Sequence, residues 1–574
     1  MRRYPTVVLA AWLCVPAAVP THGDTKVPES TLIKVLGEEL AYSMEKLAMS
    51  DGTKPYFMAY AVTEQHEVSL EAKLGTLSED KASRSRQLDV DVRVGGYKLD
   101  NTHKIRGGFL GFDPSDFFGD QAAAISLDDD PVAIRQALWL ATDRKFKDAA
   151  KKYQRVQTNL KTMVEEEDKA DDFSREEPRV YSEPEVRLDL DRASWIERLR
   201  KVSRLARQYP LIYGSEISLN AVAKNSYFVN TEGSKLQHGQ KYLRIYVTAS
   251  TKAEDGMELS QYRTFSAASE QGLPGEEELQ KAFLEVISQV LALRQAPLVE
   301  PYTGPAILKN RASAVFFHEI FGHRIEGHRQ KDVEEGQTFT KKIGEKIIPE
   351  FISVHDDPTM ARWGSTDLRG YYRFDEEGVA AENVTLVDNG VLKTFLLSRS
   401  PVQTFAKSNG HGRREPGSKV VSRMGNTIVT STKAGTFEEL RKMLVGECKK
   451  QEKPYGLLFE DITGGFTGTR RMGAQTFKVL PVVVYRVYAD GRPDELVRGV
   501  DIVGTPLMAF SKIIHAADDP DVFNGTCGAE SGGIPVSGVS PSVLVSQIEV
   551  EKRRREQDKP PLLTPPIAED KVHP

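Results

Sequence analysis

Residues 312–327 read ASAVFFHEIFGHRIEG, and this stretch carries the strongest chemical signal in the chain. Apolar residues recur every three or four positions, which is typical of an amphipathic helix with one buried face. Gly327 stands where a glycine commonly ends a helix, so we expect the helix to reach that residue. Two histidines, His318 and His323, lie in it, with Glu319 directly after the first. Two histidines on a helix are more often surface or core residues than ligands, but the adjacent Glu319 favours a metal site, because such a carboxylate can take the proton of a metal-bound water.

The spacing of the two histidines is unusual for a zinc helix. Zinc-binding histidines on a helix are usually four residues apart and share one face, whereas His318 and His323 are five apart. On a regular helix this separation turns the two side chains about 140° away from each other. Both imidazoles could then not reach one ion at about 2.1 Å. A shared metal therefore requires a distorted helix, such as a wide π-type turn, and we expect the distortion at Gly322.

A catalytic zinc site also needs a third protein ligand, because such sites hold the ion with three side chains and leave the fourth position open. Cys527 lies in NGTCGAESGG (524–533), a glycine-flanked loop before a predicted strand, and this setting favours an accessible thiolate. Glu319 is the candidate general base, since a carboxylate beside a zinc ligand can take the proton of a metal-activated water. The residues whose chemistry suits the third ligand are Cys527, His328, His411 and Glu326.

Four motifs in a fixed order carry a resemblance to a known family. They are HEIFGHRIEG at 318–327, DEEG at 375–378 followed by VDNGVL at 387–392, SNGHGRR at 408–414, and Cys527-Gly528 leading into IPV at 534–536. Together these motifs resemble those of the TldD/PmbA metallopeptidases. The likeness covers residues 306–550 well and the earlier half of the chain only by its layout.

The resemblance implies a zinc ion held by His318, His323 and Cys527, with Glu319 as general base. It also implies a substrate that is a peptide or an unfolded polypeptide, and a dimer that encloses the active site. In paired cytoplasmic systems of this family one subunit lacks the zinc motif, so this chain resembles the active, TldD-like subunit. The dimer is either a homodimer or a heterodimer with a related subunit.

Residues around the implied zinc site are candidates for an outer layer of contacts. Glu326, His328 and His411 are candidates to support the ligands or to touch substrate. His328 departs from the family pattern, in which an acidic residue follows Glu-Gly. A donor for the developing oxyanion is also needed, and His411, Arg413 and Arg414 are candidates, although a solvated turn is the simpler reading for the two arginines.

Two other interpretations compete with the enzyme. The first is a catalytically inactive subunit that binds a peptide or a partner, against which stands the retention of both histidines, Glu319 and Cys527. The second is a structural disulfide between Cys448 and Cys527, the two cysteines left if a leader containing Cys14 is removed. A disulfide is the ordinary fate of two cysteines in an oxidising compartment.

The remaining sequence predicts an α+β fold. It predicts a mixed α/β N-terminal part with an antiparallel sheet and helices, then a β-rich C-terminal domain that carries the zinc helix. Strand patterns occur at 56–62, 88–94, 217–222 and 243–247, and helical patterns at 32–49, 195–206 and 276–293, with one helix or a helical hairpin within 131–178. Later strands are expected at 384–387, 391–397, 479–488 and 542–550. The expected segments are a signal peptide (1–23), an N-terminal α/β segment (24–125), a helical insertion (126–180), a central α/β segment (181–300), a C-terminal metallopeptidase domain (301–550) and a disordered tail (551–574).

Composition and the N-terminus restrict the partners and the compartment. The chain has 574 residues, 40% hydrophobic and 28% charged, with a net charge of -5, so nucleic acid is not an expected partner. Arg2 and Arg3 precede an uncharged, largely apolar run at 6–19, the layout of a secretory signal peptide. We therefore expect a periplasmic or secreted protein with no membrane span once the signal is removed.

Overall fold

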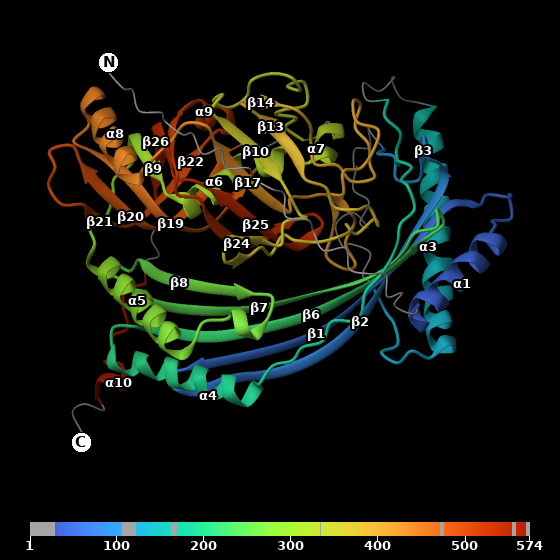
Figure 1. The fold of residues 1–574 in the computed structure, drawn as a ribbon, viewed down its shortest axis with the longest axis horizontal. Coiled ribbons are helices and arrows are strands. Elements are labelled where there is room, and N and C mark those ends of the chain that lie inside the picture. The colour runs from blue at the N-terminus through green and yellow to red at the C-terminus, as the bar shows by residue number, and fades with distance from the viewer. Residues whose placement is uncertain are drawn as a thin grey trace, which may run out of the picture.

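The computed structural model describes residues 29–105, 122–161, 169–332, 335–470, 476–553 and 558–569. The chain forms a long curved sheet with helices, followed by a strand-rich C-terminal domain that faces one side of that sheet (Figure 1). The predicted α+β fold is confirmed. The predicted signal peptide (1–23) lies outside the described residues. No helix among the described residues combines the length and the apolar character that a membrane span requires.

The N-terminal sheet is built from long antiparallel strands that pair in the order β2-β1-β6-β7-β8. At its centre, Tyr60 of β1 pairs with Val90 of β2 on one side and Val229 of β6 on the other. The long strands are β1 (Pro55–Lys73), β2 (Thr76–Gly96), β6 (Gly214–Asn230), β7 (Lys235–Lys252) and β8 (Glu258–Ala267), and the short ones are β3 (Leu99–Asp100), β4 (Ala123–Ala124) and β5 (Val180–Ser182).

Helices cover one face of this sheet in two apolar clusters. Because side chains alternate along a strand, the apolar even-numbered residues of β1 from Met58 to Ala72 point to this face. Met58 and Tyr60 join the cluster with α1 and α3, and Leu70 joins the cluster with α4 and α5. The helices are α1 (Thr31–Lys46), α3 (Pro131–Leu160), α4 (Arg192–Ser203, continued by the 3₁₀ turn η1, Arg204–Gln208) and α5 (Glu276–Gln295). The helical pattern within 131–178 is thus one long helix.

The sheet also joins segments that the sequence analysis separates. Strands β1 and β2 come from the predicted segment 24–125, and they share the sheet with β6, β7 and β8 from segment 181–300. Helix α3, from the predicted insertion 126–180, packs against β2 in the same core. The three segments therefore form one structural unit around a single sheet.

The C-terminal domain contains two larger sheets among its described residues. One has the strand order β14-β13-β10-β17-β25-β24, and the other has the order β18-β23-β26-β22-β20-β19-β9, with β21 paired to β20. The first sheet comprises β10 (Ile352–Asp356), β13 (Val384–Asp388), β14 (Val391–Leu392), β17 (Asn426–Ser431), β24 (Asp521–Ala529) and β25 (Gly532–Ser540). The second comprises β9 (Tyr302–Leu308), β18 (Ala434–Gly435), β19 (Tyr455–Thr467), β20 (Phe477–Tyr488), β21 (Glu495–Val497), β22 (Val500–Gly504), β23 (Ile513–Ala517) and β26 (Val543–Lys552).

Two details of this domain differ from the predicted elements. The strand expected at 391–397 is only two residues long, since β14 ends at Leu392. The tail expected to be disordered from residue 551 continues β26 to Lys552, and a short helix, α10, spans Pro566–Glu569.

Helix α8 (Phe437–Lys450) begins with a capping box in which Thr436 and Glu439 bond each other's backbone N–H groups.

Candidate metal centre

Helix α6 (Asn310–Ile320) lies between the two sheets of the C-terminal domain. It contacts β19 and β20 of one sheet and β24 and β25 of the other. Phe316 and Phe317 are fully buried in the main core, so the helix is apolar around most of its surface, as expected for an element enclosed by protein. His318, near its end, is therefore held on a rigid, buried support.

The helix ends before the second histidine. Phe321 has φ -112° and ψ -56°, and a 3₁₀ turn, η3 (Gly322–Arg324), follows and carries His323. A Cβ atom at Gly322 would lie 2.0 Å from the sulfur of Met424, so a larger residue there would require the buried Met424 side chain to move. The predicted distortion at Gly322 is confirmed, but it is a 3₁₀ turn and not a π-type turn.

The prediction that Gly327 ends the helix is wrong. Gly327 begins a separate short helix, α7 (Gly327–Lys331), and its N–H donates to the carbonyl of Leu396 at 2.8 Å. A Cβ atom at this position would lie 2.7 Å from that carbonyl oxygen, so the glycine serves a close backbone approach.

The break brings both imidazoles to one sulfur. The Nε2 atom of His318 lies 3.1 Å from Sγ of Cys527, and Nε2 of His323 lies 3.3 Å from the same sulfur. Cys527 is held on β24, where it pairs with Ile534 of β25. Among the described residues, this is the one group of three or more His, Cys, Asp or Glu side chains with ligand atoms within 4.8 Å of one another.

The donor set and its spacing fit zinc. Zinc bonds of about 2.1 Å to nitrogen and about 2.3 Å to sulfur, in a tetrahedron, place a nitrogen and a sulfur about 3.6 Å apart. The two observed distances, 3.1 Å and 3.3 Å, are shorter than that value by about 0.5 Å or less. Two imidazoles and one thiolate leave a fourth tetrahedral position for water or substrate.

The three groups also shift one another's pKa. Burial would raise the pKa of the Cys527 thiol, but His318 and His323 lower it well below the ordinary range. Burial would likewise lower the pKa of both imidazoles, yet the negative charge on Cys527 raises them. The cluster therefore favours a thiolate, which is the form of cysteine that binds metal.

Comparison with known proteins agrees with this geometry. Residues 301–552 match the family model of the PmbA/TldA metallopeptidase C-terminal domain. The C-terminal part of the chain is therefore similar to the PmbA/TldD metallopeptidases. A metalloprotease of Methanocaldococcus jannaschii is 25% identical over 343 residues, 58% of this chain and 67% of that protein. A zinc metalloprotease TldD homolog of Saccharolobus solfataricus is 26% identical over 279 residues, 46% of this chain and 57% of that protein.

Two solved structures share the fold of nearly the whole chain. TldE of Thermococcus kodakarensis superposes with a TM-score of 0.58 at 14% identity, over 90% of this chain and all (100%) of that one. A Thermotoga maritima protein described as a modulator of a DNA gyrase gives a TM-score of 0.59 at 17% identity, over 90% and 99% of the two chains. At these identities the likeness concerns the fold alone.

Glu319, which lies between the two histidines in the sequence, is buried, with 5% of its surface exposed. Its Oε2 atom has no hydrogen-bond partner among the described residues, and the side chain lines the cavity that reaches the metal centre. Burial raises its pKa, although His318 and His323 work in the opposite direction. A Cβ atom at Gly465 would lie 2.7 Å from Cγ of Glu319, so this glycine of β19 leaves room for the carboxylate.

Glu326 contacts Nδ1 of His323, the ring nitrogen that does not face Cys527. It is fully buried, and its Oε1 atom lies 3.2 Å from Nδ1 of His323 and 3.3 Å from Nε of Arg423. Arg329 donates to its Oε2 atom at 2.8 Å. Burial would raise the pKa of this carboxyl, but His323, Arg329 and Arg423 hold it at about 2. A carboxylate on the far nitrogen of a metal-binding imidazole fixes the ring so that the other nitrogen points to the metal.

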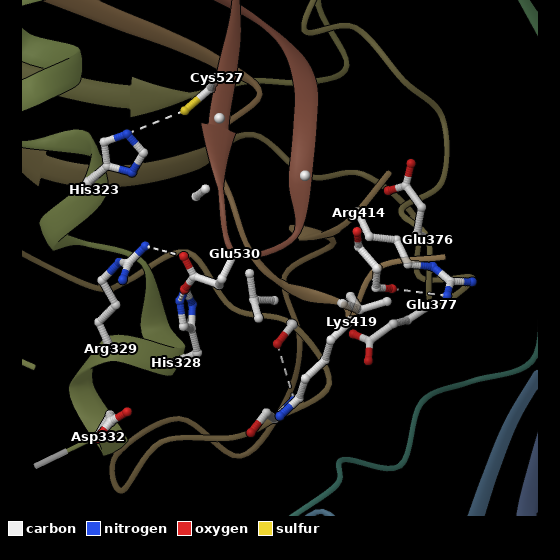
Figure 2. A pocket seen from close by; sticks show the side chains of 18 of the residues that line it. His323, His328, Arg329, Asp332, Glu376, Glu377, Arg414, Lys419, Cys527 and Glu530 are labelled. Carbon is white, nitrogen blue, oxygen red and sulfur yellow. Dashed lines mark hydrogen bonds and ion pairs between the residues drawn. The ribbon is translucent and has the colours of Figure 1, made fainter. Parts of the chain in front are cut away.

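His328 lies on α7 at the wall of the cavity (Figure 2). Its Nε2 atom is 2.6 Å from Oε1 of Glu530, whose Oε2 accepts a hydrogen bond from Arg329 at 2.9 Å. His328 and Arg329 lower the pKa of Glu530 against the effect of burial. The sequence analysis missed Arg329, Arg423 and Glu530; the three-residue spacing of Glu326 and Arg329 on one short helix was the available signal for the first of them.

The structure does not bring His411 to the cavity. Its fully buried ring lies between Asp356, 3.2 Å from Nε2, and the carbonyl of Asn409, 2.9 Å from Nδ1. Arg413 is also buried and donates to the carbonyls of Met424 and Pro535, so the expected solvated turn is wrong for it. Arg414 does line the cavity, where it pairs with Asp89 at 3.0 Å.

The alternative disulfide is absent. Cys448 and Cys527 are both free thiols. Cys448, on α8, lies in a separate apolar cluster with Leu440, Leu444 and Leu458, whereas Cys527 belongs to the main core of the domain.

A cavity of about 2260 Å³ connects the metal centre with the N-terminal sheet. Its walls include His318, Glu319 and Cys527 from the C-terminal domain and Phe57 and Arg244 from the sheet. Ligand pockets for small molecules are usually about 300–1,000 Å³. This space is large enough for an extended stretch of polypeptide.

Proposed function

We propose that this protein is a zinc-dependent endopeptidase that hydrolyses peptides or unfolded polypeptides. The observation that carries the proposal is the convergence of His318, His323 and Cys527 on one point at the wall of the cavity, beside the buried carboxylate of Glu319. Names of relatives support the chemistry, since several are metalloproteases and one is a zinc metalloprotease.

His318 and His323 would hold zinc through Nε2, and Cys527 would hold it through Sγ. A zinc ion at this point would polarise the scissile carbonyl and lower the pKa of a water molecule. Glu326 keeps the imidazole of His323 in the required orientation. The bend at Gly322 supplies the geometry that a regular helix with this spacing lacks.

Glu319 would move the protons of the reaction. Its Oε2 atom, without a partner among the described residues, is free to accept a proton from the attacking water. Its raised pKa makes it a better proton acceptor than an exposed carboxylate and lets it return the proton to the departing amine. The size of the cavity favours an extended chain as substrate over a small molecule.

Replacing Glu319 by Gln tests this role directly. We expect zinc content to be retained and hydrolysis of an unfolded protein such as casein to fall by about 10²–10⁴, the usual contribution of a general base. The control is Glu460→Gln, a half-exposed residue of β19 that pairs with Lys309, which should leave the rate unchanged. A chelator should stop hydrolysis by the wild type, and added zinc should restore it.

Two outcomes would contradict the proposed peptidase mechanism. Unchanged hydrolysis by Glu319→Gln would show that Glu319 is not the general base. A wild-type protein that binds zinc and peptide but hydrolyses nothing would support the alternative, a catalytically inactive peptide- or partner-binding subunit of a PmbA/TldD complex.

Assembly and location are further parts of the proposal. We propose a homodimer or a heterodimer with a related subunit, and a mature protein in the periplasm or outside the cell. The basic start and the apolar run at 6–19 support export. Light scattering of the purified protein, and fractionation of expressing cells, test the two statements separately.

A further inference from the structure

The face of β7 that points to the C-terminal domain carries an arginine between two tyrosines. Leu243 and Ile245 are buried against α5, so the alternating residues Tyr242, Arg244 and Tyr246 point the other way. Arg244 and Tyr246 both line the cavity of the metal centre. The guanidinium of Arg244 lies 5.3 Å from the centre of the Tyr246 ring, which itself stacks on Tyr262 of β8.

Arg244 has no counter-ion in the part of the chain that the structure describes. Its guanidinium makes no hydrogen bond or ion pair with any described residue, and its Nε atom is buried without an acceptor. Burial lowers its pKa, and the nearby Arg311 lowers it further. A buried donor without an acceptor costs about 1–3 kcal/mol, and more when the group is charged.

A second arginine with the same defect lies beside it. The guanidinium of Arg369 is 5.0 Å from the centre of the Tyr242 ring, and its Nε atom is also buried without an acceptor among the described residues. Its Nη1 donates to the carbonyl of Gly525 and the hydroxyl of Thr526, each at 3.4 Å, and its side chain also bonds Tyr242. Burial and the charge of Arg244 lower its pKa to about 10. These contacts attach Arg369 to the strand that carries Cys527.

The carboxylates nearby do not neutralise the pair. Asp461 lies 3.7 Å from Nε of Arg311, so it balances that third arginine and leaves two positive charges over. Around Glu326, by contrast, the buried Arg329 and Arg423 both reach a carboxylate. Arg244 at the cavity wall, with Arg369 beside it, leaves positive charge that an anion would stabilise, because carboxylates form short, charge-assisted bonds with guanidinium groups.

We propose that Arg244, with Arg369 beside it, forms a carboxylate-binding subsite of the cavity, which selects peptides with a carboxylate at one position near the scissile bond. The carboxylate is either an acidic side chain or the free C-terminus of the substrate. This proposal rests on the proposed peptidase function.

Strand β24 places the subsite near the metal centre. Arg369 contacts Gly525 and Thr526, and Cys527 follows Thr526 on the same strand. Tyr246 and Tyr262 line the cavity beside Arg244, with rings that can pack against the side chains of a bound peptide.

The test compares matched peptides on the zinc-loaded full-length protein. One series places Glu or Gln at successive positions from the scissile bond, and a second ends in a free carboxylate or an amide. We expect KM to be about tenfold lower for the carboxylate member of the pair at one position of a series, and equal for both members at the other positions. Arg244→Gln should bring that ratio close to one, and Arg244→Lys should keep part of it.

Arg263→Gln is the matched control. Arg263 lies on the adjacent strand β8, is half exposed and pairs with Glu285 of α5, so its loss should leave the ratio unchanged. If Arg244→Gln does not fold, as judged by circular dichroism, Arg369→Gln takes its place. The series that shows the effect distinguishes an acidic side chain from a free C-terminus.

Peptide binding to the Glu319→Gln protein separates the two proposals. Fluorescence anisotropy there should show the same tenfold preference in Kd even if the wild type hydrolyses nothing. Equal Kd values for all carboxylate and neutral pairs, or a preference that persists in Arg244→Gln and Arg369→Gln, would overturn the subsite and leave the peptidase proposal standing.

Discussion

Two buried thiols of the C-terminal domain have similar burial and opposite chemistry. Cys448 lies beneath α8 among leucines, and burial raises its pKa to about 11. Cys527 lies on β24 between two imidazoles, which outweigh burial and lower its pKa well below the ordinary value. The difference lies in the neighbours: a thiol among apolar side chains stays protonated and inert, and a thiol facing imidazoles becomes a ligand.

The largest expected effect is the loss of zinc and of hydrolysis when Cys527, but not Cys448, is replaced. Cys527→Ala removes the one sulfur of the cluster, so we expect no retained zinc after dialysis and no detectable hydrolysis. Cys448→Ala should retain both zinc and activity, and lose about 1 kcal/mol of unfolding free energy through the small cavity it leaves. Zinc analysis, casein hydrolysis and urea unfolding of the two variants measure these effects. Equal loss of zinc in both would contradict the comparison.

A smaller effect, on zinc affinity, is expected for Glu326, which contacts the ring of His323. Glu326→Gln keeps the shape of the side chain but removes the charge that holds His323, so we expect zinc affinity to fall by about 10–100-fold. Competition with a chromogenic chelator measures the affinity. The control is Glu335→Gln, which contacts Arg329 at 3.2 Å without reaching His323. If Glu326→Gln binds zinc as tightly as the wild type, the supporting role of Glu326 is excluded.

The same contrast extends to two histidines, and here the expected effect is on the stability of the fold and not on metal binding. His323 has the carboxylate of Glu326 beside it, whereas His238 lies against Phe374 and near the cations Lys224 and Arg373. Burial and these cations lower the pKa of His238 to about 4. The unfolded chain, with an ordinary histidine pKa of about 6.5, therefore takes up this proton first as the pH falls.

His238 should thus contribute stability that is present above pH 6.5 and is lost between pH 6.5 and 4, by at most about 3 kcal/mol. Urea unfolding at pH 7 and pH 4.5 measures the loss in the wild type and in His238→Gln. The variant should lose less stability on acidification than the wild type. An identical loss in both would show that His238 is not held neutral in the folded protein.

The sequence predicted local features well where they depend on local pattern. The alternation at 88–94 located only part of β2, which begins at Thr76. The first part of the strand was not predicted, because residues 78–85 are exposed on both faces and show no alternation. The five-residue spacing of the histidines predicted a distortion at Gly322. The form of that distortion depends on Phe321 and on the packing of Met424 over Gly322, which a local pattern does not contain.

Features that depend on contacts between distant segments could not be predicted from the sequence. His411 has suitable chemistry but is enclosed with Asp356, a residue from another strand. Arg244 and Arg369 come from separate segments, and only the fold places them together without a carboxylate between them. The joining of β1 and β2 with β6, β7 and β8 is equally a matter of long-range pairing.

The central claim is that one zinc ion is held by His318, His323 and Cys527. X-ray absorption at the zinc edge of the purified wild-type protein tests it most directly. The account predicts one zinc per chain with a single sulfur neighbour at about 2.3 Å and two imidazole nitrogens at about 2.1 Å. Zinc without a sulfur neighbour, or a folded protein that retains no zinc, would contradict it.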